Sequence, residues 1–414
     1  MAQTRKVTKQ ELATLWFHEF RLPLLIIILV IEIFSVKAIS QIKRLSIKTA
    51  SPKEKALLFG LLAIFNLTLI LVFFDIPYLR LKYYLLAVFF MPSLLMLLAF
   101  LYAIYVWQFK PRLKLDNFRL SESAKGSLAK LELSGIALLL GAALWGTFVT
   151  TDNIEATHET LYFDRLPKEL DGLVIAHLSD IHFGESLGEK ELENVINITM
   201  RQKPDLIAIT GDFLDASIGR IPNMTALLRR LRAPLGVYAV LGNHDFYLDP
   251  DKIGASLRRA GIVLLQNGSA SLPFHEAKIR LNIVGVDDYW GSIYGEEGAN
   301  LDKAFYGLDR KDFTIFLSHQ PILFDKTDRF SFDLMLSGHT HGGQVGLWGE
   351  WGKIISLGRL SSPYVFGVYK KDGRILYVTR GIGTTGLPLR LGISPEIAIL
   401  TLRAKKSKVS PANP

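Results

Sequence analysis

The sequence contains no cysteine among its 414 residues. Disulfide bonds, thiolate metal sites and cysteine nucleophiles are therefore excluded, and any bound metal must be held by nitrogen and oxygen. The second half also lacks a basic surplus: residues 151–414 hold 30 Lys and Arg against 31 Asp and Glu, whereas residues 1–150 hold 18 against 8. A nucleic-acid-binding domain carries its own basic surface. The second half shows no such basic surface, apart from a short basic tail at 403–414 that we expect to be disordered. We therefore expect no nucleic-acid partner.

The first 150 residues are rich in long apolar segments. Four of them, at 22–36, 56–74, 85–107 and 131–149, have about the 17–25 residues needed to cross a bilayer. The mean hydropathy of the whole chain, +0.25, agrees with a part of it lying in lipid. We therefore predict a membrane domain of four transmembrane helices over residues 1–150. The alternative, buried core helices, is strongest for the first segment, which contains Glu32.

Basic residues are unevenly distributed among the connections between these segments. The loops at 37–55 and 108–130 each contain six Lys and Arg, whereas the N-terminal tail contains four and the connection at 75–84 two. Loops rich in Lys and Arg usually remain in the cytoplasm. The protein is thus predicted to be a multi-pass inner-membrane protein whose second half lies on the extracytoplasmic side.

After a linker with a hairpin at 151–170, the pattern changes to short apolar runs separated by turns and amphipathic stretches. Buried strands are predicted at 173–178, 206–210, 237–241, 281–286, 313–317 and 334–336, and helices at 189–202, 224–231 and 252–259. This alternation indicates an α/β or α+β fold, with two packed sheets possible. Functional groups in such folds collect at the carboxyl ends of strands.

Polar motifs follow five of these strands. They are Asp180-Ile181-His182, Gly211-Asp212, Gly242-Asn243-His244-Asp245, Ser318-His319 and Gly338-His339-Thr340-His341. Together they offer two carboxylates, an amide and four imidazoles as ligands, with His244 left over. This donor set suits two divalent cations, manganese, iron or zinc rather than calcium. Within a motif, we expect Asp180 and His182 to point the same way on a continuing strand, as His339 and His341 would on an extended segment.

Taken alone, each motif can also be explained by a structural role that involves no metal. Asp212 is equally a helix N-cap, and His319 equally a buried core histidine. His177, inside the first strand, is predicted to be core, and the pair Asp287-Asp288 to cap a turn rather than to support the site.

The order and spacing of the motifs resemble the calcineurin-like metallophosphoesterases over about residues 171–402. The resemblance implies a four-layer sandwich of two mixed sheets flanked by helices. It assigns Asp180, His182, Asp212 and His341 to one cation, and Asp212, Asn243, His319 and His339 to the other. His244, aided by Asp245, would contact the phosphoryl oxygen or protonate the leaving group.

The segment from Thr379 to Gly386, followed by Pro388, Arg390 and Pro395-Glu396, is similar to a branch of this family with an N-terminal membrane anchor. That likeness implies lipid- or envelope-directed phosphoesterases, including enzymes that cleave UDP-2,3-diacylglucosamine. Gly381, Gly383 and Arg390 are candidates for binding phosphate through backbone N–H groups and a guanidinium. The alternative is a plain hairpin loop.

These observations predict a membrane-anchored phosphoesterase with two divalent metal ions. It would hydrolyse a phosphodiester, phosphomonoester or pyrophosphate bond with a metal-activated water, on a lipid-linked or envelope substrate at the phospholipid membrane. One alternative is a UDP-2,3-diacylglucosamine pyrophosphatase of lipid A synthesis. Another is a membrane signalling or scaffold protein with a structural metal site, and a third is a transporter regulated by the hydrolase domain.

Overall fold

The computed structural model describes residues 141–142, 145–184, 187–215, 218–274, 279–347, 355–360, 362–386 and 389–405. Three of the four predicted transmembrane segments lie outside these residues, as does most of the fourth and most of the tail at 403–414. Within the described ranges, no helix is both long and apolar enough to cross a bilayer. The chain divides into two compact units, 1–145 and 146–414, and nearly all described residues belong to the second.

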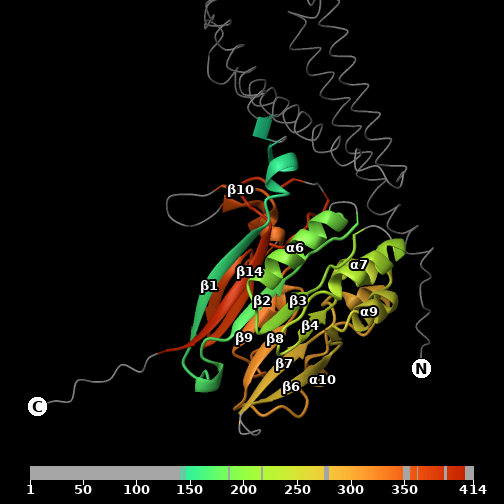
Figure 1. Ribbon diagram of the computed structural model, residues 1–414. Helices are drawn as coiled ribbons and strands as arrows, with labels where there is room; N and C mark the ends of the chain where they lie inside the picture. Colours follow the sequence, from blue (N-terminus) through green and yellow to red (C-terminus); the bar gives the residue numbers. More distant parts are fainter. Residues whose placement is uncertain are drawn as a thin grey trace, which may run out of the picture. The chain divides into compact units, whose positions relative to one another are not determined.

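Two mixed sheets of six strands each form the centre of this second unit (Figure 1). The order of the first sheet is β1 (Glu155–Phe163), β14 (Glu396–Ala404), β2 (Val174–Leu178), β3 (Leu206–Thr210), β4 (Val237–Val240) and β5 (Val263–Leu264). The order of the second is β12 (Gly367–Lys371), β13 (Arg374–Val378), β9 (Leu334–Ser337), β8 (Phe313–Leu317), β7 (Ile279–Gly285) and β6 (Gly268–Phe274). A short hairpin pairs β10 (Gly346–Leu347) with β11 (Ile355–Ser356).

Alternating side chains explain why the two sheets pack face to face. In β3, Leu206 and Ala208 join the core between the sheets, whereas Ile207 and Ile209 join the core on the helical side. In β8, Ile315 faces the other sheet and its neighbour Phe316 faces outward. A strand with both faces covered reads as a continuous apolar run, which is why the sequence marked these strands clearly.

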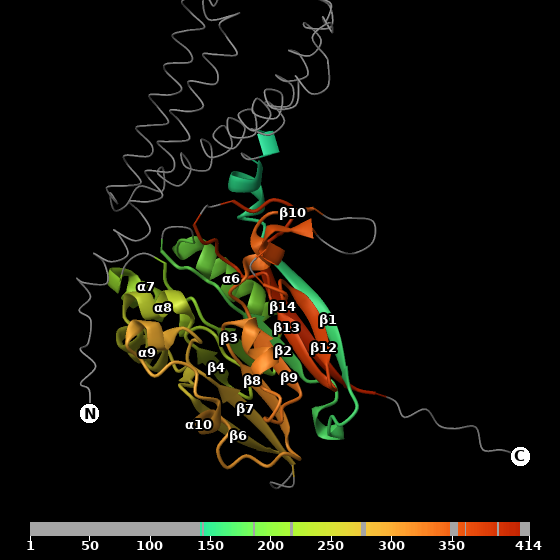
Figure 2. The ribbon, with the colours of Figure 1, turned by 180° about the vertical axis from the view of Figure 1, so that it is seen from behind.

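Helices cover the outer faces of both sheets, as predicted (Figure 2). The first sheet is covered by α6 (Glu189–Arg201), α7 (Ile221–Leu228) and α9 (Pro250–Arg259), which contribute apolar side chains to one core cluster. The second sheet is covered by shorter elements, α10 (Leu301–Ala304) and the 3₁₀ helix η7 (Pro321–Lys326). The four layers are therefore unequal in thickness.

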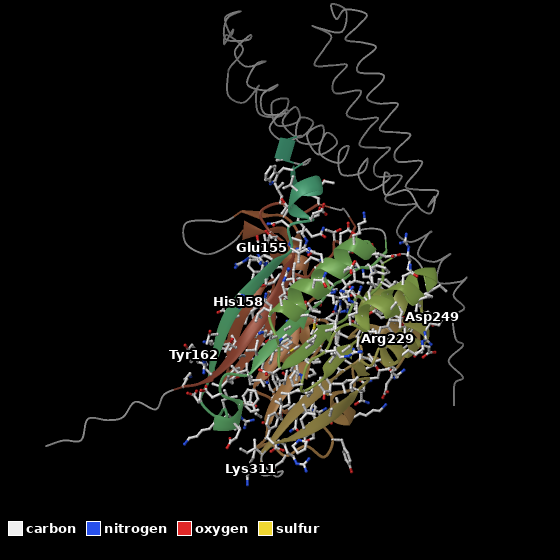
Figure 3. The ribbon with its side chains drawn as sticks, in the orientation of Figure 1. Glu155, His158, Tyr162, Arg229, Asp249 and Lys311 are labelled. Carbon is white, nitrogen blue, oxygen red and sulfur yellow. The ribbon has the colours of Figure 1, made fainter. Side chains whose placement is uncertain are left out.

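The segment at 151–170 is not a linker, contrary to the prediction. It forms β1, which lies at the edge of the first sheet and pairs in parallel with β14 along its full length, from Glu155 opposite Glu396 to Phe163 opposite Ala404. Its outward side chains are polar or exposed, including His158 and the half-exposed Tyr162 (Figure 3). Only Leu161 and Phe163 are buried, so the strand has little of the apolar pattern that marks a central one.

Candidate active site

The candidate ligands lie directly after strand ends, on backbone that has left the strand. Five non-glycine ligands have left-handed backbone: Asp180 (φ 51°), His182 (φ 47°), Asp212 (φ 55°), His339 (φ 72°) and His341 (φ 50°). The expectation that each pair extends along a continuing strand or an extended segment is therefore wrong. Left-handed backbone costs a non-glycine residue about 1–2 kcal/mol, and such outliers cluster at functional sites.

Buried carboxylates hold these loops together. Asp180 accepts hydrogen bonds from the backbone N–H of His339 at 3.0 Å to both of its oxygens. Asp245 accepts three, from the N–H groups of Asp212 (3.0 Å), Phe213 (2.9 Å) and Gly242 (2.9 Å). Each carboxylate thus joins the loop after one strand to the loop after another.

Two glycines are required by close approach rather than by a turn. A Cβ on Gly242 would lie 2.2 Å from Asp212 Oδ1, and one on Gly338 would lie 2.2 Å from Asp180 Oδ2. Gly242 has φ −106°, a conformation open to any residue. Its role is therefore to let the Asp212 carboxylate pass, not to let the backbone turn sharply.

The side chains from these loops converge into one cluster. His341 Nε2 lies 3.3 Å from Asp180 Oδ1 and 3.1 Å from His182 Nε2. His319 Nε2 lies 3.2 Å from Asp212 Oδ2, 3.1 Å from Asn243 Oδ1 and 3.2 Å from His339 Nδ1. Asp212 Oδ2 also lies 3.6 Å from His182 Nε2, so this carboxylate lies between the two groups.

All seven predicted ligands are thus brought together, and their chemistry fits a pair of divalent cations. Three sets of side chains have ligand atoms within 4.8 Å of one another: Asp180, His182 and His341; His182, Asp212 and His244; and Asp180, Asp212 and His319. Imidazole nitrogens that face one another with carboxylates between them are the donors expected around first-row metals. Apart from the half-buried His339, the seven are buried, so cations there would be largely shielded from water.

Burial and mutual attraction set the charges of these groups. Burial lowers the pKa of His339 to about 3 and that of His341 below its usual range, so both rings are neutral and have a lone pair to donate. Burial opposes the ionisation of Asp212 and His319, but their attraction holds the pKa of Asp212 low and raises that of His319 to about 10. A cation ligated by His319 would displace that proton.

The side chain of His244 is 25% exposed, whereas all the ligands except the half-buried His339 are buried. Its Nδ1 lies 3.8 Å from Asp215 Oδ1, and the same carboxylate oxygen lies 3.6 Å from His182 Nδ1. Asp245, predicted to aid His244, instead has both oxygens engaged by backbone N–H groups. The carboxylate beside His244 is Asp215, three residues after Asp212, which the sequence analysis did not select.

Gly381, Gly383 and Arg390, the candidates for phosphate binding, contact the protein itself. The N–H of Gly383 donates to the Asp180 carbonyl at 2.7 Å, and that of Gly381 donates to Thr379 Oγ1 at 3.3 Å. Arg390 is fully buried, and its Nη2 donates to the carbonyls of Arg380, Gly381 and Gly383. These three residues therefore support the loop of Asp180 rather than reach toward a phosphate.

Two further predictions concern residues beside the cluster. His177 is fully buried with its Nε2 2.8 Å from Thr210 Oγ1, the position of a core histidine. Asp288 accepts the N–H of Trp290 at 2.9 Å, as a turn cap does, and also the side-chain amide of Gln320 at 3.0 Å. The prediction of a turn cap is therefore confirmed for Asp288, whereas Asp287 accepts the side-chain amide of Asn267 at 3.0 Å.

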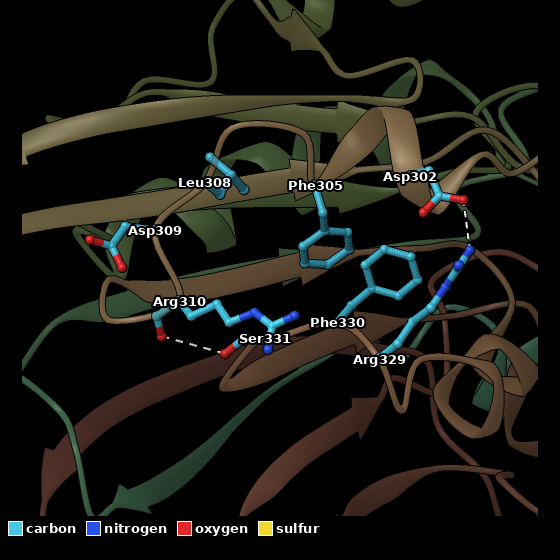
Figure 4. A pocket seen from close by; sticks show the side chains of 8 residues that line it. All are labelled: Asp302, Phe305, Leu308, Asp309, Arg310, Arg329, Phe330 and Ser331. Atoms are coloured by element: carbon cyan, nitrogen blue, oxygen red, sulfur yellow. Dashed lines mark hydrogen bonds and ion pairs between the residues drawn. The ribbon is translucent and has the colours of Figure 1, made fainter.

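A separate open hollow of about 330 Å³ lies before the amino ends of β8 and β9 (Figure 4). It is lined by Asp302, Phe305, Leu308, Asp309, Arg310, Arg329, Phe330 and Ser331. None of the predicted site residues is among them. Because the ligand motifs follow the carboxyl ends of the strands, this hollow is distinct from the candidate active site.

Comparisons with known proteins agree with this geometry. The model of the calcineurin-like phosphoesterase family matches residues 173–343. An uncharacterized metallophosphoesterase of Aquifex aeolicus is 32% identical over 272 residues, which cover 65% of this chain and 98% of that protein. A zebrafish (Danio rerio) "transmembrane protein with metallophosphoesterase domain" is 29% identical over 299 residues, 70% of this chain and 67% of that protein.

Among solved structures, the NAD nucleotidase of Haemophilus influenzae matches with a TM-score of 0.35 and 15% identity, over 51% of this chain and 45% of that one. The family assignment does not depend on it: the Aquifex relative is matched over almost its whole length, and the family's motif residues converge here. The chain belongs to the calcineurin-like metallophosphoesterase family and is a metal-dependent hydrolase of phosphoesters.

Proposed function

We propose that this protein is a membrane-anchored phosphoesterase with two divalent metal ions that acts on a lipid-linked or envelope phosphoester. The observation that carries the proposal is the convergence of seven nitrogen and oxygen ligands beside a partly exposed histidine. Manganese, iron or zinc bound by these ligands would polarise the phosphoryl group and lower the pKa of a water molecule.

Besides the metal ions, His244 and Asp215 would assist the reaction. Asp215 lies beside Nδ1 of His244, which favours a proton on that nitrogen and directs Nε2 away from it. Burial lowers the pKa of His244, so proton donation requires the imidazolium form, in which Nε2 carries a proton that it can give to the leaving-group oxygen. A purely structural metal site needs no such half-exposed histidine, which argues against the scaffold alternative.

Membrane anchoring is supported by the four apolar segments before residue 150 and by the names of the zebrafish and bovine relatives, both "transmembrane protein with metallophosphoesterase domain". A tethered domain meets lipid head groups at a high local concentration. An amphiphilic phosphoester would therefore benefit from the anchor more than a freely diffusing one would.

Hydrolysis can be tested with the full chain purified in detergent. We expect bis-p-nitrophenyl phosphate or p-nitrophenyl phosphate to be hydrolysed after loading with manganese, and the activity to vanish with EDTA and return when manganese is restored. Asp212→Ala should lose turnover by at least about 10³-fold, because it removes the carboxylate placed between the two groups. Retained activity in this variant would refute the two-metal mechanism.

Location can be tested with a reporter that is active only outside the cytoplasm. We would fuse it after Pro414, and place a matched control in the loop at 108–130, which is predicted to be cytoplasmic. Activity after Pro414 and silence in the loop would support an envelope substrate. The reverse pattern would overturn the extracytoplasmic location and favour a cytosolic-face substrate, for which UDP-2,3-diacylglucosamine is the first to assay.

A further inference from the structure

The loop at 381–386, between β13 and β14, is held by hydrogen bonds from two side chains. Arg390 Nη2 donates to the carbonyls of Arg380, Gly381 and Gly383 at 2.9, 3.1 and 2.5 Å. On the other side, the side-chain amide of Gln344 bonds the backbone of Thr385 twice. Its Nε2 donates to the Thr385 carbonyl at 3.1 Å, and its Oε1 accepts the Thr385 N–H at 2.8 Å.

This double attachment fixes the position of the half-buried Thr385 side chain. Its Oγ1 lies 3.4 Å from His244 Nε2, the ring nitrogen that faces away from Asp215. A threonine hydroxyl both donates and accepts. It therefore matches Nε2 whether or not that nitrogen carries a proton. An oxygen that received a proton from Nε2 would come close to this hydroxyl.

We propose that Thr385 is a substrate-contacting residue whose hydroxyl donates a hydrogen bond to the leaving-group oxygen beside His244. The inference rests on the proposed hydrolysis. In that reaction the water oxygen forms a bond to phosphorus and the bond from phosphorus to the leaving-group oxygen breaks. The leaving oxygen takes a proton from Nε2 of the His244 imidazolium, which regains a proton from solvent, and the proton lost by the water passes to solvent. Thr385 makes and breaks no covalent bond.

A hydrogen bond from Thr385 to the leaving oxygen favours one class of substrate over another. Negative charge on the leaving oxygen grows most when the leaving group is a weak acid, so a hydrogen bond there matters most for esters of ordinary alcohols. Phosphate as a leaving group, in a pyrophosphate, needs less assistance. The site is thus better suited to an alkyl phosphoester than to a pyrophosphate.

The test compares Thr385→Val with Thr385→Ser in the full chain, loaded with manganese in detergent. Valine keeps the shape of the side chain and removes the hydroxyl, and serine restores it. Thr160→Val, on the exposed part of β1, is the matched control. Each protein is assayed with aryl phosphates of increasing leaving-group pKa, from p-nitrophenyl to phenyl phosphate. Unfolding temperature and manganese affinity are measured alongside.

We expect Thr385→Val to lower kcat/KM for phenyl phosphate about 10- to 100-fold, the loss typical of a hydrogen bond to a charged oxygen. The loss for p-nitrophenyl phosphate should be smaller, the serine variant should recover most of the activity, and Thr160→Val should match the wild type. Gln344→Leu, which releases Thr385, should show the same dependence on leaving group. This second variant keeps the test decisive if Thr385→Val misfolds.

Two results would overturn the inference alone: unchanged activity of Thr385→Val on both esters, or an equal loss on both, which would indicate a structural role. A wild-type protein that hydrolyses no phosphoester would refute the proposed function, and the inference with it. The failure of one is therefore distinguishable from the failure of the other.

Discussion

Replacing Arg390 with methionine removes a guanidinium that lies wholly inside the protein. Its Nη2 donates to three backbone carbonyls, whereas its Nε and Nη1 are buried and have no hydrogen-bond partner among the described residues. Its Nη2 also lies 3.5 Å from His341 Nδ1, on the side of that ring facing away from the ligand cluster. Methionine fills a similar length of apolar space without a charge.

Two opposing free-energy contributions decide how Arg390→Met changes stability: the cost of burying the charge and the hydrogen bonds that the guanidinium makes. Burial lowers the pKa of Arg390 from 12.5 to about 9, which corresponds to about 5 kcal/mol for keeping the group charged inside the fold. Methionine avoids this cost. In exchange, the carbonyls of Arg380 and Gly383 lose their partner, at about 1–3 kcal/mol each. The Gly381 carbonyl keeps the N–H of Glu396 at 3.0 Å.

Because the two quantities nearly cancel, we expect Arg390→Met to change the free energy of unfolding by less than about 2 kcal/mol. Activity should fall much further, about 10-fold or more, because the loop that carries Thr385 is no longer held in place. Stability is measured by denaturant unfolding followed by tryptophan fluorescence, and activity by hydrolysis of an aryl phosphate.

Arg229→Met, at the exposed C-cap position that follows α7 (Figure 3), is the matched control and should alter neither quantity. A loss of more than about 4 kcal/mol in Arg390→Met would show that the hydrogen bonds of the guanidinium outweigh its burial cost. Full activity in a folded Arg390→Met protein would show that the loop does not need this attachment. Either result refutes the reasoning.

Three further predictions concern Asp215, Gly338 and Asp287. In protein saturated with manganese, Asp215→Asn should lower kcat about 10- to 100-fold, because it removes the charge beside His244 Nδ1. The same oxygen lies 3.6 Å from Nδ1 of the ligand His182, so metal content is checked by elemental analysis. An unaltered kcat at full metal content would exclude the role of Asp215 beside His244. Gly338→Ala should weaken manganese binding at least about 10-fold in calorimetry, because its methyl group would lie 2.2 Å from Asp180 Oδ2. The control is Gly268→Ala, whose methyl group would have no atom nearer than 3.8 Å, and it should bind manganese normally. Burial, and after it the charge of Glu297, raises the pKa of Asp287 to about 6. Between about pH 4 and 6 the folded state therefore holds a proton that the unfolded state releases. The stability that this proton contributes is lost as the pH rises through 6. Asp287→Asn should therefore gain about 1–3 kcal/mol over the wild type at pH 7 but not at pH 4, and an equal change at both values in thermal unfolding would contradict this.

The central strands were predictable because each carries its own signal. β3 and β8 have the predicted bounds, since a run buried on both faces is apolar throughout. β1 and β14 were not predicted, and the region around β14 showed only a motif and a loop. Their pairing joins residues as far apart as Glu155 and Glu396, so no local pattern could show that 151–170 belongs to a sheet.

The ligands were predictable for a different reason. Polar residues directly after buried strands must gather at one edge of the sheets, whatever the conformation of each loop. The supporting residues could not be found in this way. Asp215 and Thr385 approach His244 only through tertiary contacts. Thr385 lies in the segment from Thr379 to Gly386 that the motif comparison included, but the sequence does not show that its hydroxyl meets His244.

The loop conformations show how the fold keeps such a site in place. Five ligands adopt left-handed backbone, at a combined cost of about 5–10 kcal/mol, which a chain tolerates only where surrounding contacts enforce it. Those contacts are the backbone hydrogen bonds accepted by Asp180 and Asp245, together with the glycines at 242 and 338 that admit the carboxylates. Asp245 therefore belongs to the site although it faces no ligand position, because the buried Asp245 carboxylate holds the Asp212 and Gly242 loops in register. A residue can thus be identified correctly from its motif and still act through the backbone rather than through the chemistry first assigned to it.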